Sequence, residues 1–107
     1  MADKTFSDVQ PIVIHVDPEI RDLIPDFLDN RRRDVAALAD AVGARDFDAV
    51  YRLGHSLKGV GGGFGFDGIS DIGRDIEGAA LSKRLDDLED RIQALRSYLD
   101  NLKLIYD

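Results

Sequence analysis

The sequence contains no cysteine and no long apolar run. Without cysteine the chain can form neither a disulfide framework nor a thiolate metal site, which suits a reducing compartment. No uninterrupted apolar stretch approaches the ~20 residues that a membrane-spanning helix needs, and Met1–Thr5 lacks the apolar segment of a signal peptide. We therefore expect a soluble, cytoplasmic protein that does not enter a membrane.

The sequence has fewer basic than acidic residues. Fourteen Lys and Arg against 21 Asp and Glu give a formal net charge of -7, which repels a polyanion and argues against nucleic-acid binding. The only local exception is Arg31–Arg33, which Asp29 and Asp34 are near enough to neutralise. We interpret this triplet as a solvated helix face; the alternative is a partner-facing patch.

The apolar spacing predicts one all-α domain. The chain of 107 residues is 44% hydrophobic, enough for the core of a single compact domain. Residues 1–16 are expected to form an N-terminal arm, in which the β-branched run Ile12–Val16 is extended, lies against the rest of the domain and is too short to form a sheet alone. Residues 17–107 are expected to form an antiparallel up-down four-helix bundle, because the connections between helical stretches are short.

Capping residues, a proline and glycines predict the bounds of the first two helices. Asp17 is a predicted N-cap, and Pro25 predicts a kink or an extra helical turn before a longer helix that ends before Gly43. Asp46 is the predicted cap of the second helix, and Gly65 is its predicted stop.

The last two helices are bounded in the same way. Asp67 is the predicted cap of the third helix, and Ser82 is the predicted cap of the fourth. Apolar residues alternating by three and four predict that the fourth helix continues from Leu85 to Tyr106.

The second helix carries a histidine outside its apolar stripe. At ~100° per residue, His55 lies about 100° from Gly54, which shares the stripe with Gly61. Gly59 and Gly62 follow on the face of His55, where each interior glycine costs a helix about 1 kcal/mol relative to alanine. We interpret these two glycines as clearance for another macromolecule beside the imidazole, and the stripe glycines as sites of close helix packing.

Lys58 follows three residues after the histidine, close enough for its ammonium to reach a group attached to the imidazole. A neutral imidazole is a nucleophile, and a phosphoryl group is the anion that such a pair suits. The residues therefore predict that His55 accepts a phosphoryl group, through its outer ring nitrogen, beside the charge of Lys58.

The pentapeptide from His55 to Gly59, followed by small residues and Gly65, resembles the signature His-x-Leu-Lys-Gly-x5-Gly of histidine-containing phosphotransfer (HPt) domains. The similarity extends over nearly the whole chain. The run Gly61–Gly63 departs from the family, which more often has Ala, Ser or Asn there, and this departure bears on the stability of the helix end.

The resemblance implies a phosphoryl carrier of a two-component phosphorelay, not an enzyme. It makes His55 the phosphoacceptor, Lys58 the charge stabiliser and Gly59 the clearance for a docking partner. We expect the partner surface to include Arg52, Gly62 and, at its edge, Ser56. The expected partners are receiver domains and a sensor or hybrid histidine kinase.

The family pattern also bears on cofactors and assembly. The Mg²⁺ used in transfer belongs to the partner receiver, so no metal or cofactor is expected in this chain. We expect a monomer. The initial methionine and the domain-sized length favour a free-standing protein over a piece of a hybrid kinase.

Two other functions are compatible with single features of the sequence. Gly63–Gly68 formally matches the dinucleotide fingerprint Gly-x-Gly-x-x-Gly, but that loop requires a preceding strand in a parallel sheet, and a helical pattern precedes it here. A helical adaptor or dimerisation module, using the helix from Leu85 to Tyr106 as its interface, is the alternative from a different class. His15 has no neighbouring Lys or Gly, and we assign it no chemical role.

Overall fold

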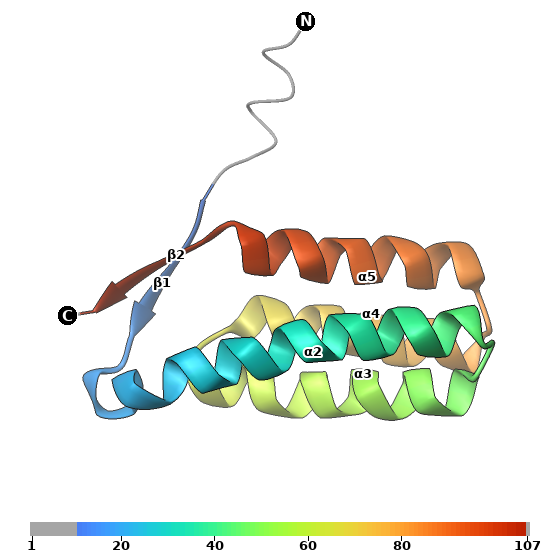
Figure 1. Cartoon of the computed structure of the whole chain (residues 1–107), viewed down its shortest axis with the longest axis horizontal. Coiled ribbons are helices and arrows are strands. Elements are labelled where there is room, and N and C mark those ends of the chain that lie inside the picture. Colours follow the sequence, from blue (N-terminus) through green and yellow to red (C-terminus); the bar gives the residue numbers. More distant parts are fainter. Residues whose placement is uncertain (1–10, 107) are drawn as a thin grey trace, which may run out of the picture.

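The computed structural model describes residues 11–106, so the expected arm at residues 1–16 is described only from Pro11 onward. Four α-helices dominate this part of the chain, and a pair of short strands joins its two ends (Figure 1). In chain order the elements are β1 (Ile12–Val16), η1 (Pro18–Leu23, a 3-10 helix), α2 (Ile24–Gly43), α3 (Phe47–Gly61), η2 (Gly62–Phe64, 3-10), α4 (Asp67–Leu81), α5 (Leu85–Asp100) and β2 (Leu102–Tyr106).

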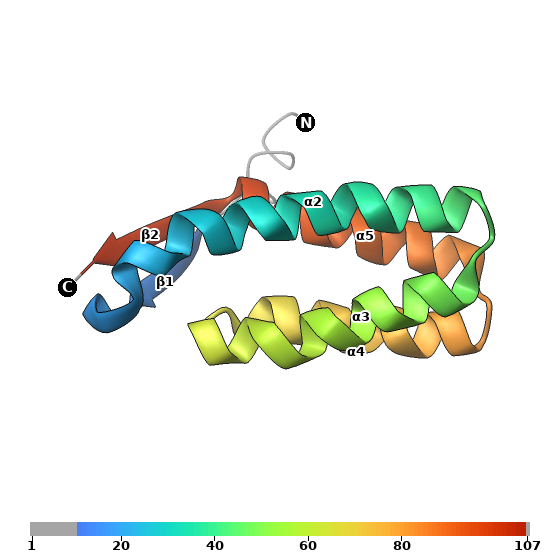
Figure 2. The same ribbon diagram turned by 60° about the horizontal axis from the view of Figure 1, so that its bottom comes forward.

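The four helices lie side by side, and the chain turns back at each connection between them (Figures 1 and 2). The helical fold expected from the apolar spacing is thus confirmed. The apolar stripes meet in one core, whose largest fully buried side chains are Phe66, Ile24, Leu38, Leu57, Ile69, Ile76, Leu88, Leu95 and Val50. Within residues 11–106 we find no helix with the length and apolarity needed to cross a membrane.

Two predicted caps are confirmed. The Asp17 carboxylate accepts a hydrogen bond from the backbone N–H of Glu19 at 2.9 Å, and the Asp46 carboxylate accepts one from Ala49 N–H at 3.1 Å. Pro25 stands in the first turn of α2, directly after the separate turn η1, as its fixed φ predicts.

The other two predicted caps are wrong. Phe66, which is buried, occupies the N-cap position of α4, and Asp67 is the first helical residue. Ser82 ends α4 instead of starting α5, because Lys83 adopts a positive φ of 54° and turns the chain. The N-cap position of α5 is held by Arg84, whose side chain pairs with an acid in the first turn.

The C-terminal end is the main correction to the predicted fold. The last helix ends at Asp100 and not at Tyr106, since residues 102–106 form β2, which pairs in parallel with β1 from Ile12 opposite Leu102 to Val16 opposite Tyr106. The segment Ile12–Val16 is extended as predicted, but it belongs to a two-stranded sheet. A short apolar run is compatible with either a helix or a strand, and the unpaired backbone of β1 decides between them here.

The strand pair does not support dinucleotide binding at the glycine-rich segment. Gly63–Gly68 begins within η2, directly after α3, and the one described strand that comes earlier in the chain, β1, is separated from it by η1, α2 and α3. The parallel pair lies at the chain ends, so no strand-turn-helix phosphate loop is formed.

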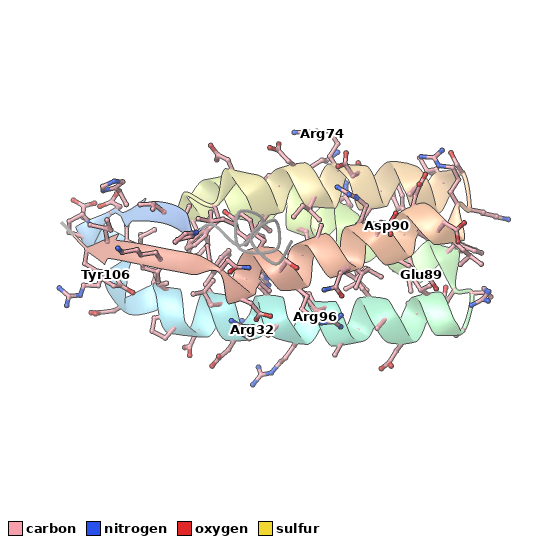
Figure 3. All side chains as sticks on the ribbon, turned by 90° about the horizontal axis from the view of Figure 1, so that it is seen from above. Arg32, Arg74, Glu89, Asp90, Arg96 and Tyr106 are labelled. Atoms are coloured by element: carbon pink, nitrogen blue, oxygen red, sulfur yellow. The ribbon has the colours of Figure 1, made fainter. Side chains whose placement is uncertain are left out.

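The basic triplet is used within the fold. Arg31 pairs with Asp34 at 2.8 Å, as expected, and Arg32 reaches across to Asp100 of α5 at 2.9 Å. Figure 3 shows Arg32 and Arg96 on neighbouring helices α2 and α5, with Tyr106 out on β2. The triplet therefore makes contacts within and between helices.

Candidate functional site

His55 lies in α3, on the side of the helix turned away from the core. Its side chain is 63% exposed, which agrees with the wheel position outside the apolar stripe. Lys58 is one turn further along the helix and is 36% exposed. The helix thus presents a solvent-accessible imidazole beside an ammonium group, because residues three apart share a face of a helix.

Glu77 of α4 connects these two side chains. Its Oε2 lies 2.6 Å from His55 Nδ1, and its Oε1 accepts a hydrogen bond from Lys58 Nζ at 2.8 Å. The Glu77 side chain is only 13% exposed, so the bridging carboxylate sits beneath the two exposed groups. One carboxylate therefore fixes the positions of both the imidazole and the ammonium.

The bridge determines which imidazole nitrogen is available. The hydrogen bond from Lys58 and then the one from His55 hold the pKa of the Glu77 carboxyl below its ordinary value of 4.5, against the opposing effect of desolvation. An ionised carboxylate can only accept hydrogen bonds, so Nδ1 of His55 carries the hydrogen. The lone pair of the neutral ring is then on Nε2, the nitrogen that Glu77 does not occupy.

The lowered pKa of Glu77 predicts an acid-sensitive contribution to stability. An acid whose pKa is depressed by folding stabilises the fold above its unfolded value of 4.5 and loses that effect as the pH falls through the folded value. Wild type should therefore be more stable than Glu77→Gln near neutral pH, with the difference shrinking below 4.5. Urea unfolding of both proteins across this range measures it, and a constant difference would contradict the assignment.

Glycines bring α4 close enough for Glu77 to reach α3. A Cβ on Gly54 would lie 2.9 Å from the backbone nitrogen of Glu77, and one on Gly73 would lie 2.5 Å from the backbone nitrogen of Lys58. Such distances are shorter than real Cβ contacts, so a larger residue at either position would separate the helices. The prediction that Gly54 serves close packing is confirmed, and Gly73 serves it from the facing helix.

The glycine run at the end of α3 has a partly structural origin. A Cβ on Gly61 would lie 2.7 Å from the backbone nitrogen of Ser70, so this position requires glycine. The backbone N–H of Gly62 donates to Ser70 Oγ at 2.8 Å, and that hydroxyl donates to the carbonyl of Lys58 at 2.9 Å. Contacts with α4 therefore stabilise the end of α3, where the run Gly61–Gly63 departs from the family pattern.

The remaining predicted site residues lie on α3 with the histidine, or directly after the helix at the start of η2. Arg52, Ser56, Gly59 and Gly62 are all exposed. A Cβ on Gly59 would meet nothing within 4 Å outside its own helix backbone in the described chain, whereas one on Gly62 would make ordinary contacts with α4. Clearance beside the imidazole is thus greatest at Gly59.

Glu77 was not predicted from the sequence. It is 22 residues from His55, and the only local signal is its place four residues after Gly73, at the border of the apolar stripe of α4. No spacing rule links that border to a histidine on another helix. Among residues 11–106 no group of three or more metal-ligating side chains is arranged to hold a metal ion.

The fold and the site together define a class: a helical domain that presents a histidine with one free ring nitrogen, backed by a carboxylate and flanked by a lysine. The family model described as Hpt domain matches residues 22–104, and the chain belongs to this family. It is therefore a histidine phosphotransfer module of the kind used in phosphorelays, a carrier that works with receiver domains and histidine kinases. Neither the curated proteins nor the solved structures yield a match to this chain.

Proposed function

We propose that His55 is the phosphoacceptor and that this chain carries a phosphoryl group between partners of a two-component phosphorelay. The donor is the aspartyl phosphate of a receiver domain or a histidine kinase, and the acceptor is another receiver. The observation that carries the proposal is the hydrogen bond from His55 Nδ1 to Glu77, which directs Nε2 of an exposed ring toward an incoming donor. The carrier is proposed to act as a cytoplasmic monomer.

Transfer from a receiver is a displacement at phosphorus. The Nε2 lone pair forms the N–P bond while the O–P bond of the aspartyl phosphate breaks, and the aspartate leaves as a carboxylate on the receiver. The same steps run in reverse when His55 serves as donor. The Mg²⁺ ion is expected in the acidic pocket of the receiver, where its charge offsets the charge that develops during transfer.

The three side chains suit the charges that form in this step. The imidazole becomes cationic when Nε2 is phosphorylated, and the Glu77 carboxylate already faces its Nδ1–H. Lys58 has three N–H donors and gives one to Glu77, so the others are available to phosphoryl oxygens. Each developing charge thus has an opposite charge within the site before the reaction begins.

Labelling identifies the partner and the bond. Receiver domains charged with ³²P are mixed one at a time with the protein, and the label that it acquires is tested for stability in acid and alkali. Acid-labile, alkali-stable label is the expected result, since it is characteristic of a phosphoramidate bond to histidine. If no receiver, no kinase and no small phosphoramidate donor labels the folded protein, the carrier function fails and the adaptor alternative gains.

We propose that the docking surface centres on His55 and Lys58 and includes Arg52, Gly59 and Gly62, with Ser56 at its edge. Gly59→Leu would place a side chain in the open space beside the imidazole. We expect this variant to lose transfer from a receiver by at least roughly tenfold, because even a small displacement of the reacting atoms is costly. Labelling by phosphoramidate, which needs no docked protein, should change little. Gly43→Leu, at another open glycine away from α3, is the control, and equal loss with both donors would contradict the docking role.

A further inference from the structure

An aromatic ring is stacked beside the histidine. The rings of Tyr51 and His55 are stacked, with centroids 6.1 Å apart and planes inclined by 13°. Tyr51 is half-buried and belongs to the same helix, one turn before the histidine. This is the offset parallel arrangement that aromatic rings favour at such separations.

Helix geometry explains why the two rings meet. Side chains of an α-helix point back toward its N-terminus, so the imidazole of His55 lies over the residue four positions earlier, which is Tyr51. Four positions later stands Gly59, where a Cβ would find no neighbour within 4 Å beyond its own helix in the described chain. The imidazole is therefore supported on its N-terminal side and open on its C-terminal side.

The two neighbours of the imidazole constrain different motions. Glu77 holds Nδ1 and so opposes a flip of the ring that would turn Nε2 inward. Tyr51 is stacked beside the ring in a nearly parallel plane and so opposes a tilt out of that plane. We propose, given His55 as the phosphoacceptor, that Tyr51 is a positioning residue that sets the plane of the imidazole and stabilises the phosphorylated ring.

The stabilisation has a physical origin in charge. Phosphorylation at Nε2 with hydrogen retained on Nδ1 makes the imidazole ring cationic, and the face of an aromatic ring attracts a cation. The neutral ring gains less from the same contact, so the interaction strengthens as the N–P bond forms. Such an interaction is expected to increase the transfer rate about fivefold at an exposed position, equivalent to ~1 kcal/mol.

A small donor separates positioning from docking. With phosphoramidate the N–P bond to His55 forms as the donor's own P–N bond breaks and ammonia leaves, with no partner protein present. We expect Tyr51→Leu, which retains apolar bulk without an aromatic face, to be labelled about fivefold more slowly than wild type. Tyr51→Phe retains the ring and should be labelled at the wild-type rate. Tyr51→Met is a second non-aromatic variant in case Tyr51→Leu lowers the melting temperature.

Spectroscopy provides a readout that a purely structural role would leave unchanged. In wild type and Tyr51→Phe the ring protons of His55 should share a ring-current shift in the NMR spectrum, and in Tyr51→Leu and Tyr51→Met that shift should disappear while the rest of the spectrum is retained. The His55 signals are assigned by their absence from His55→Gln.

Three results would overturn the proposal. The first is a wild-type rate of Tyr51→Leu with phosphoramidate, even if its transfer from a receiver falls, since that pattern belongs to a docking residue. The second is equal slowing of Tyr51→Phe, which would assign the effect to the hydroxyl. The third is a set of His55 signals that does not respond to loss of the aromatic ring. Failure of wild type itself to be labelled would instead overturn the phosphoacceptor role of His55, on which the inference rests.

Discussion

Replacing His55 with glutamine is expected to abolish phosphoryl acceptance completely while leaving the fold intact. Glutamine has no ring nitrogen that can attack phosphorus, but its amide can still donate a hydrogen bond to Glu77. Because the His55 side chain is 63% exposed, the free energy of unfolding should change by no more than about 0.5 kcal/mol. Label transfer from a charged receiver and from phosphoramidate measures the loss, and thermal unfolding measures the fold.

The second histidine provides a matched control. The sequence has two histidines, and His15 lies in β1, well away in the chain from α3. His15→Gln should accept label as wild type does. Retained acid-labile label in His55→Gln, or its loss in His15→Gln, would move the phosphoacceptor away from His55.

Gly73→Ala is expected to be the most damaging single-methyl substitution near the site. The new Cβ would lie 2.5 Å from the backbone nitrogen of Lys58 and 2.8 Å from the carbonyl oxygen of Gly54, and these backbone atoms cannot turn aside as a flexible side chain would. We expect α3 and α4 to separate, at a cost of about 1–3 kcal/mol and a decrease in melting temperature of roughly 5–20 °C. Because Glu77 follows one turn later on α4, the hydrogen bonds to His55 and Lys58 should lengthen, and the rate of phosphoryl acceptance should fall as well.

Gly78 offers the opposite case in the same helix. A Cβ there would meet nothing within 4 Å outside its own helix backbone in the described part of the chain. Gly78→Ala should therefore stabilise the protein by up to about 1 kcal/mol through helix propensity alone, with no change in transfer. Thermal and urea unfolding of Gly73→Ala and Gly78→Ala test both predictions. Equal destabilisation by the two substitutions would show that Gly73 does not serve helix packing.

Much of the helical fold follows from local patterns. The Asp46 cap gives the start of α3, and the three-and-four spacing places His55 outside the apolar stripe. The α-helix ends at Gly61, before the predicted stop at Gly65, and the 3-10 helix η2 continues to Phe64. The predictions failed at α4 and α5, where Asp67 and Ser82 have the chemistry of caps but tertiary packing places the helix starts elsewhere. Phe66 is fully buried at the N-cap position of α4, where its side chain makes no capping hydrogen bond.

The prediction that the last helix continues to Tyr106 was wrong for a different reason. Leu102–Tyr106 continues the helical apolar spacing, but its first three residues also alternate between apolar and polar, and in β2 they alternate between half-buried and exposed. Only the presence of Ile12–Val16 alongside, which offers unpaired backbone groups, makes the extended form preferable. Neither segment alone has a sequence pattern that indicates pairing with the other.

The sequence by itself determined the exposed histidine, the lysine one turn later and the bare position at Gly59, because residues three and four apart in a helix share a face whatever the rest of the chain does. The tertiary structure alone decided that Glu77 would hold both side chains, that Gly73 would bring its helix close enough, and that the chain ends would pair as strands. These features depend on contacts between segments far apart in the chain, and the apolar patterns that drive such packing specify which faces meet but not which polar side chains lie at their borders.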